Sequence, residues 1–170
     1  MIKKKRPYLL LIGISAVVIA LDQWSKWLVE QNIGLGEEIY PIRALAPFFR
    51  FTNWQNTGAA FGLFQNANLM FLILAIIISV LLVWTYHKSI DEPVLLRISL
   101  SLMLGGAIGN IIDRIRQGFV TDFVAVGRFP VFNVADSAVT IGVGLMLLIL
   151  FLQERKEKRL QKEDEVVRED

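Results

Sequence analysis

The chain contains no cysteine and only one histidine. Without cysteine it cannot form disulfides, thiolate nucleophiles, cysteine-ligated metal sites or a lipid anchor on its own cysteine. The histidine lies in Tyr86-His87-Lys88, directly after an apolar run, and we interpret it as an interfacial residue. There it completes neither a metal site nor a serine–histidine pair, so we expect no metal ion and no cofactor.

Charged residues are rare in most of the sequence. Of its 170 residues, 54% are hydrophobic, and the mean hydropathy is +0.51. A soluble domain of this length is less apolar. Four runs approach the length of about 20 residues that spans a bilayer: about 8–28, 69–86, 94–112 and 131–152. We predict an all-α membrane protein with four transmembrane helices in one integral membrane domain, residues 1–152.

The positive charge is concentrated at the two ends of the chain, within a net charge of +2 and a pI near 9.0. Lys3–Arg6 precede the first predicted span, and Arg155–Lys162 follow the last. By the positive-inside rule both termini are cytoplasmic, as an even number of spans requires. We expect no nucleic-acid partner. Residues 153–170 also contain many acidic residues, which predicts a charged cytoplasmic tail, a solvated helical end that frays.

The first apolar run also has an alternative interpretation as a cleaved signal peptide, because basic residues precede it and small residues lie within it. The run nevertheless continues past Asp22 into Trp24 and Trp27. This continuation favours a retained membrane span.

Residues 32–68 contain several helix breakers, including Gly34, Pro41 and Pro47. Aromatic and branched residues lie between them, at 39–40 and 48–54, and predict short strands in an interfacial layer. The predicted topology places this layer outside the cytoplasm. In the third span, Gly105 and Gly109 are four residues apart and predict a close helix–helix contact.

Polar residues gather at the ends of the spans that face this outer layer. The set comprises Asp22, Lys26, Asn56, Asn110, Asp113, Arg114, Asp122, Asn133 and Asp136. Asp122 and Asp136 are the pair of greatest interest, since two adjoining carboxylates suffice for acid–base hydrolysis by water. An ionisable residue at the mouth of a membrane helix indicates function by default.

Each of these polar residues also has a purely structural interpretation. Asp22 and Lys26 lie on one helix face and can simply neutralise each other. Asp113 and Arg114 can anchor a helix end. Asn133 is well placed as a helix N-cap, and Asp136 alone can favour the positive end of the helix dipole. The functional hypothesis depends on the whole set at one membrane face.

The motifs that contain these residues occur in a characteristic order. They are Asp22-Gln23-x-x-Lys26, Asn56-Thr57-Gly58-Ala59-Ala60-Phe61, Gly105-Gly106-Ala107-x-Gly109-Asn110-x-x-Asp113-Arg114, Val120-x-Asp122-Phe123 and Phe132-Asn133-x-Ala135-Asp136-Ser137. Together the motifs resemble bacterial lipoprotein signal peptidase, or signal peptidase II, over about residues 8–152.

The resemblance implies a membrane aspartic endopeptidase that removes signal peptides from prolipoproteins, cutting just before a diacylglyceryl-modified cysteine. It implies a fold of four transmembrane helices with a small extracytoplasmic β-sheet cradle. It also implies that the enzyme lies in the bacterial cytoplasmic (inner) membrane, with its active site at the extracytoplasmic face. By position, the catalytic residues are Asp122 and Asp136. The substrate-binding or supporting residues are Asp22, Lys26, Asn56, Gly58, Asn110, Asp113, Arg114 and Asn133. We expect a prolipoprotein substrate, contact with membrane lipid and a monomeric enzyme.

Other classes fit the pattern less well. A small transporter or channel would favour repeated halves and broken helices near the midplane, whereas here the polar groups gather at one face. A structural or assembly protein would need no aspartate pair. The Gly-x-Gly-Asp signature of one type of intramembrane aspartyl protease is absent from this sequence.

Overall fold

The computed structural model describes residues 6–58 and 67–169. Four helices in these ranges are long and apolar enough to cross a membrane, and a small sheet accompanies them, which confirms the predicted fold class. In chain order the elements are α1 (Arg6–Asn32), β1 (Glu38–Ile39), the 3-10 turn η1 (Arg43–Leu45), β2 (Phe49–Asn56), α2 (Asn68–Lys88), α3 (Val94–Gln117), β3 (Val120–Val126) and α4 (Val134–Glu169).

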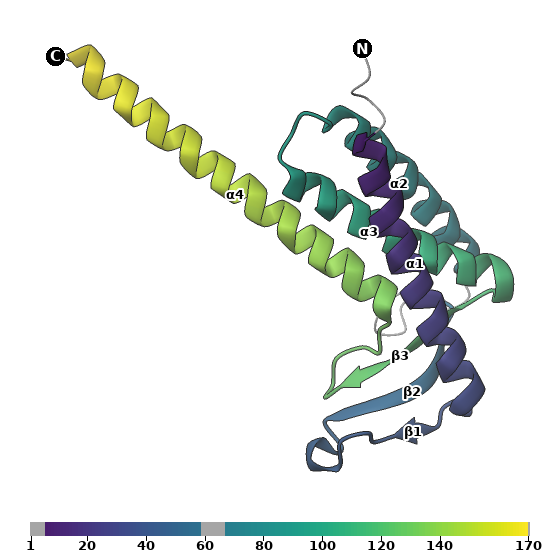
Figure 1. The fold of residues 1–170 in the computed structure, drawn as a ribbon. Coiled ribbons are helices and arrows are strands. Elements are labelled where there is room, and N and C mark those ends of the chain that lie inside the picture. Colours follow the sequence, from purple (N-terminus) through teal and green to yellow (C-terminus); the bar gives the residue numbers. More distant parts are fainter. Residues whose placement is uncertain (1–5, 59–66, 170) are drawn as a thin grey trace.

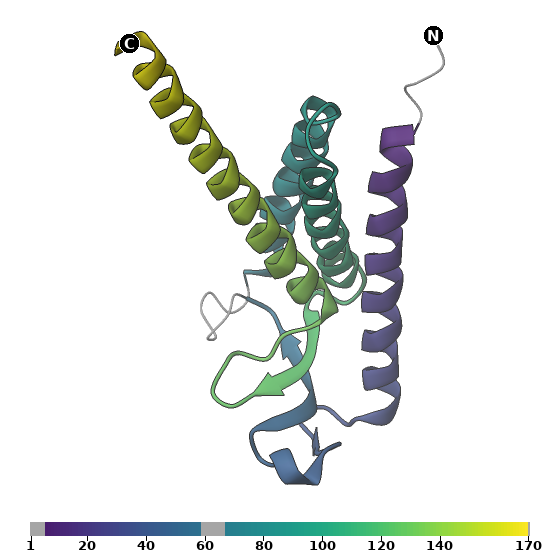
Figure 2. The ribbon, with the colours of Figure 1, turned by 60° about the vertical axis from the view of Figure 1, so that its left-hand side comes forward.

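Helix α3 is the centre of the bundle and packs against α1, α2 and α4 (Figures 1 and 2). The predicted glycine contact is present. A Cβ atom on Gly105 would lie 2.8 Å from the Cβ of Val18, and one on Gly109 would lie 2.6 Å from an oxygen of Asp22. On another face of α3, a Cβ atom on Gly106 would lie only 2.3 Å from the carbonyl oxygen of Ala135 on α4. Small residues therefore bring α1 and the start of α4 close to α3.

The sheet lies at one end of the bundle, opposite the end from which α1 starts and toward which α4 runs (Figures 1 and 2). Its strand order is β1-β2-β3, and both pairs are antiparallel. Strands β1 and β2 correspond to the predicted segments at 39–40 and 48–54. The register of β2 and β3 shifts between Phe51 and Trp54, and beyond the shift Trp54 pairs with Asp122. The sheet thus carries Asp122 to the mouth of the bundle.

Two elements add to the sequence interpretation. Helix α3 continues past the apolar run at 94–112 to Gln117, where Gly118 ends it in the left-handed conformation at φ 82°. Asp113 and Arg114 lie near this end of the helix. The next residues form β3, although no strand was predicted there. The charged tail continues α4 to Glu169.

Two apolar clusters hold the layers together. Leu11, Tyr86 and Leu100 join α1, α2 and α3 at the end remote from the sheet. Val29, Ile33 and Phe123 join the end of α1 to β3. Large apolar side chains elsewhere point outward, especially on α2, where only 11% of the residues in the most apolar stretch are buried. A helix surface of this kind suits contact with lipid.

Candidate active site

The start of α4 is fixed by two reciprocal hydrogen bonds. The backbone N–H of Asp136 donates to Oδ1 of Asn133 at 2.9 Å, and the backbone N–H of Asn133 donates to Oδ2 of Asp136 at 3.3 Å. This arrangement is a capping box, which satisfies two N–H groups of the first helical turn. The predicted cap at Asn133 is present, and it fixes the carboxylate of Asp136 at the helix entrance.

Asp122 is almost fully buried on β3, with 2% of its surface exposed. Its Oδ1 accepts a hydrogen bond from Nδ2 of Asn133 at 2.7 Å, and its Oδ2 accepts one from Nδ2 of Asn56 at 2.9 Å. Burial, and next the negative charge of Asp136, raise the pKa of Asp122 from 3.8 to about 7, against the opposing effect of these two donors. A carboxyl group with a pKa near neutrality can both donate and accept a proton under ordinary conditions.

Asn133 and Asn110 connect the two carboxyl groups. Asn133 is completely buried, and the same side chain caps Asp136 and donates to Asp122. Asn110 on α3 donates from Nδ2 to Oδ1 of Asp136 at 2.8 Å. Nδ2 of Asn133 also donates to Oδ1 of Asn110 at 3.2 Å. The two asparagines thus hold carboxyl groups from a strand and a helix in one network.

A second layer of charge lies behind Asn110. The Nζ of Lys26 donates to Asp22 at 2.8 Å, to Asn110 at 2.9 Å, and lies 2.7 Å from Oδ2 of Asp113. The other oxygen of Asp22 accepts a hydrogen bond from the backbone N–H of Ala135 at 2.9 Å. Asp22 and Lys26 do neutralise each other, but they also bind the first turn of α4 and an asparagine of the site.

Other contributing residues were not singled out by the sequence analysis. Nε2 of Gln23 donates to Asp113 at 2.8 Å, and the Thr121 hydroxyl donates to Glu30 at 2.6 Å. Gln23 follows Asp22 in the first motif, so its place in a motif was the available signal. Thr121 carried no signal in the sequence apart from its position beside Asp122, because its partner Glu30 lies on a different element.

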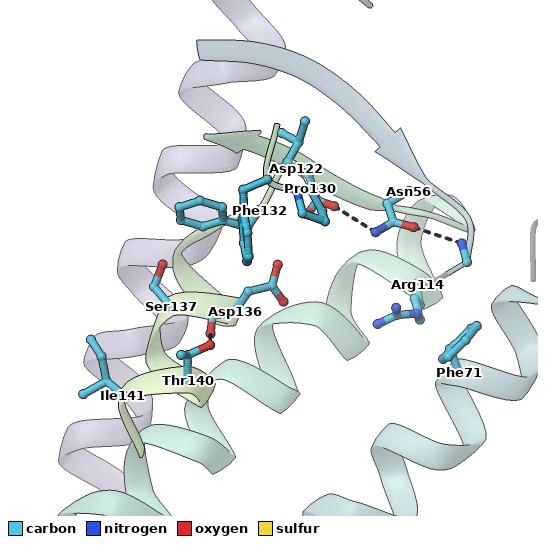
Figure 3. Close-up of a pocket in the computed structure, with 13 residues that line it drawn as sticks. Asn56, Phe71, Arg114, Asp122, Pro130, Phe132, Asp136, Ser137, Thr140 and Ile141 are labelled. Atoms are coloured by element: carbon cyan, nitrogen blue, oxygen red, sulfur yellow. Dashed lines mark hydrogen bonds between the residues drawn. The ribbon is translucent and has the colours of Figure 1, made fainter. Parts of the chain in front are cut away.

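A cavity of about 580 Å³ opens beside the two aspartates. Asp122, Asp136, Asn56 and Arg114 supply polar groups to its wall, and Figure 3 shows these side chains around one space. The remaining lining is largely apolar and comprises Gly58, Phe71, Phe129, Pro130, Val131, Phe132, Ser137, Thr140 and Ile141. An apolar pocket with a few convergent polar groups is the form that most ligand sites take.

Arg114 supplies positive charge to this cavity. Its guanidinium lies over the ring of Phe71 at 5.8 Å. Within the described ranges, no carboxylate forms a salt bridge with it. As one of the residues that line the cavity, it is placed to contact a bound group there.

A second cavity of about 310 Å³ lies between α2, α3 and α4. Its wall is mostly apolar and includes Ala75, Ile78 and Ala107. Asp136 and Thr140 line both cavities. The carboxylate of Asp136 therefore lies where the space beside the sheet meets the space between the membrane helices.

The structure brings the residues singled out from the sequence together. Asp122, Asp136, Asn56, Gly58 and Arg114 line the main cavity, and Asn110 lines the second one. Asn133, Asp22, Lys26 and Asp113 lie behind them in the hydrogen-bond network. The motif that begins at Asn56 continues into residues 59–66, which lie outside the described ranges. In those ranges no group of three or more histidine, aspartate or glutamate side chains is placed to hold a metal ion.

Fold and site together define a multi-pass membrane protein with two neighbouring carboxyl groups at the mouth of its helix bundle. A family model described as signal peptidase (SPase) II matches residues 14–152. Over 147 residues the chain is 44% identical to the lipoprotein signal peptidase of Shouchella clausii, covering 86% of this chain and 95% of that protein. Its identity to the lipoprotein signal peptidase of Enterococcus faecalis is 40% over 148 residues, covering 85% and 89%.

Solved structures show the same similarity in three dimensions. A bacterial membrane enzyme determined by the in meso method at 2.3 Å superposes with a TM-score of 0.76 at 34% identity, covering 87% of this chain and 90% of that one. A second, at 1.9 Å, gives a TM-score of 0.72 at 34% identity, covering 82% and 91%. The chain belongs to the signal peptidase II family. It is therefore a membrane-embedded protease that removes signal peptides.

Proposed function

We propose that this chain cleaves prolipoproteins just before a diacylglyceryl-modified cysteine, with Asp122 and Asp136 as the catalytic pair. The observation that carries the proposal is that Asn133 donates to both carboxyl groups, to Asp122 from its side-chain Nδ2 and to Asp136 from its backbone N–H, where an outer sheet meets a membrane helix. Two carboxyl groups held in one network share a proton more readily than they both ionise.

The proposed reaction is direct hydrolysis. The ionised aspartate removes a proton from water, whose oxygen attacks the scissile carbonyl carbon, while the protonated aspartate donates to the carbonyl oxygen. When the tetrahedral intermediate collapses, the carbon–nitrogen bond breaks. The departing amine takes the proton that came from water, and one hydroxyl of the intermediate returns its proton to the aspartate that had donated to the carbonyl oxygen. The low-polarity lining strengthens these electrostatic interactions, and Arg114 binds a polar group of the substrate.

The position of the site fits a substrate held partly in lipid. We infer that the sheet end of the bundle faces away from the cytoplasm, in the bacterial cytoplasmic membrane, with both chain termini inside. A diacylglyceryl group then anchors the cysteine at the depth of the dyad, since each buried CH₂ contributes about 0.8 kcal/mol. We propose a monomeric enzyme that contacts membrane lipid and has no nucleic-acid partner, and residues 1–152 as its peptidase domain.

Purified protein should cleave a diacylglyceryl-modified precursor, and Asp122→Asn and Asp136→Asn should each lower kcat by at least about 10²-fold. A dyad fails as a unit because each carboxyl group serves only with its partner. The measurement is release of signal peptide in detergent micelles, with thermal unfolding to show that each variant is folded.

Asp91→Asn provides the matched control, because Asp91 is an exposed aspartate in the turn between α2 and α3. It should retain the wild-type kcat. Wild-type turnover by either folded dyad variant would contradict the assignment.

A further inference from the structure

We propose that Lys26 is a positioning residue for the catalytic pair: it binds the side-chain oxygen of Asn110 and thereby turns the amide NH₂ group toward Asp136. The inference rests on the proposed function. It assigns a specific task to a lysine that lies outside the lining of the main cavity.

The hydrogen bonds define the orientation of the amide. Lys26 is buried, with 2% of its surface exposed, and its Nζ lies 2.9 Å from Oδ1 of Asn110. An ammonium group only donates, so the atom that faces it must be the amide oxygen. Nδ2 of Asn133 donates to the same oxygen at 3.2 Å. A flipped amide would place its NH₂ group against two donors, and the NH₂ group is thereby directed to Asp136.

This orientation of the Asn110 amide favours one assignment of the base and the proton donor within the pair. Asp136 accepts from Nδ2 of Asn110 at 2.8 Å and from the backbone N–H of Asn133 at 3.3 Å. It also lies in the first turn of α4, where the helix dipole favours negative charge. Each of these interactions stabilises a carboxylate. Asp136 is then the ionised base and Asp122 the proton donor, in keeping with the raised pKa of Asp122.

The lysine is itself held in place by two carboxylates, Asp22 at 2.8 Å and Asp113 at 2.7 Å. Among the described residues, the charged or titratable groups around Asp136 are therefore Asp22 and Lys26 on α1, Asp113 and Arg114 on α3, and Asp122 on β3. Removing Lys26 leaves two buried aspartates without their cation, which threatens folding as well as catalysis.

The test is the pH dependence of kcat for cleavage of a diacylglyceryl-modified precursor by Lys26→Met and Asn110→Leu. Asn110→Leu removes the donor but keeps the lysine charge. Loss of the donor removes a hydrogen bond that stabilises the carboxylate form of the base, so the acid limb of the profile should move to higher pH in both variants. We expect kcat to fall about 10- to 100-fold with little change in KM. Lys88→Met, at the far end of α2, should keep the wild-type profile.

The outcomes separate the alternatives. An acid limb that moves only in Lys26→Met would mean that the lysine acts through its field and not through Asn110. An unmoved limb in both variants would mean a merely structural lysine. Either result overturns the proposal.

If Lys26→Met does not fold, the comparison is Lys26→Met/Asp113→Asn against Asp113→Asn, since the double variant keeps the net charge of the wild-type cluster. If the proposed function itself is wrong, the wild-type enzyme will not cleave the modified precursor at all. That result differs from an unmoved acid limb.

Discussion

At the level of single residues, asparagine side chains hold the two carboxyl groups of the site in position. Asn56, Asn110 and Asn133 each direct an NH₂ group at one of the two aspartates. Their oxygens are occupied by other donors, including the backbone N–H of Gly58 for Asn56. Because each amide is bound at both ends, none is free to rotate. The carboxyl groups are therefore held in place before substrate arrives, as the proposed reaction requires.

Asp122 should make the stability of the protein depend on pH. Its pKa is raised from 3.8 to about 7, chiefly by burial. Between these values the folded protein retains a proton that the unfolded chain releases, so this group makes stability fall as pH rises from about 4 to about 7. Asp122→Asn removes the titration. The decrease in Tm between pH 5 and pH 8 should therefore be smaller in Asp122→Asn than in the wild type, measured by thermal unfolding in detergent.

The comparison uses the change of Tm with pH rather than absolute Tm values. It thereby cancels the pH-independent cost of placing an amide, instead of the Asp122 carboxyl group, against the NH₂ groups of Asn56 and Asn133. Asp91→Asn should keep the wild-type slope, because that carboxyl group is exposed. An identical slope in Asp122→Asn and the wild type would contradict the raised pKa.

The sequence identified the residues of the site better than it identified their contacts. Asp122 and Asp136 stood out because carboxyl groups near an apolar segment are costly. Lys26 and Asp113 were expected only to support the site or to pair with neighbours along the chain. Their actual link joins α1 to α3, and no local pattern in the sequence contains it.

At the level of elements, the site depends on how closely α4 approaches α3. Gly106 faces the first turn of α4, where a Cβ atom would lie 2.3 Å from the Ala135 carbonyl oxygen and 2.8 Å from Cγ2 of Val139. Backbone atoms cannot give way as a flexible side chain can. The absence of a side chain at this one position therefore helps to place Asp136, one residue after Ala135.

Gly106→Ala should both destabilise the protein and impair catalysis. Overpacking of this kind costs about 1–3 kcal/mol, and displacing α4 moves Asp136 away from Asn110 and Asn133. We expect a lower Tm and a fall in kcat in the same purified variant. Gly144→Ala is the matched control on α4, because a Cβ atom there would meet nothing within 4 Å. If Gly106→Ala matched this control in both measurements, the close contact would not position the site.

The elements also show where prediction from sequence failed. The four apolar runs predicted the four helices. A segment inside lipid must pair its own backbone N–H and C=O groups, and a single segment does so only as a helix. Helix α3 extends past its apolar run to Gln117, and Lys26 from another helix compensates the charge of Asp113 there. Strand β3 was missed because its residues 120–123 are all buried, without the alternation that marks a half-buried strand.

At the level of the whole molecule, the two ends of the bundle differ in character. The sheet, the two cavities' shared carboxylate and the buried charge network lie toward one end, while α4 carries its charged extension away from the other (Figures 1 and 2). The positive-inside rule assigns the basic end to the cytoplasm. The predicted orientation therefore rests on the distribution of charge.

Thiol labelling in intact cells should establish this orientation. The chain contains no cysteine, so each engineered cysteine is the only one present. Arg128 is exposed in the loop after β3, and Gln161 is exposed on the extension of α4, so each is replaced by cysteine in a separate variant. A membrane-impermeant reagent, applied to spheroplasts if an outer membrane intervenes, should label position 128 and not position 161 until the cells are lysed. Asp91→Cys, in the turn between α2 and α3, should behave like position 161. Because the dyad adjoins the sheet, the same orientation predicts that an unlipidated precursor is a very poor substrate, whereas the modified precursor is cut on the amino side of its cysteine. Labelling at 161 and 91 but not at 128 would reverse the topology and, with it, the membrane face at which the substrate meets the enzyme.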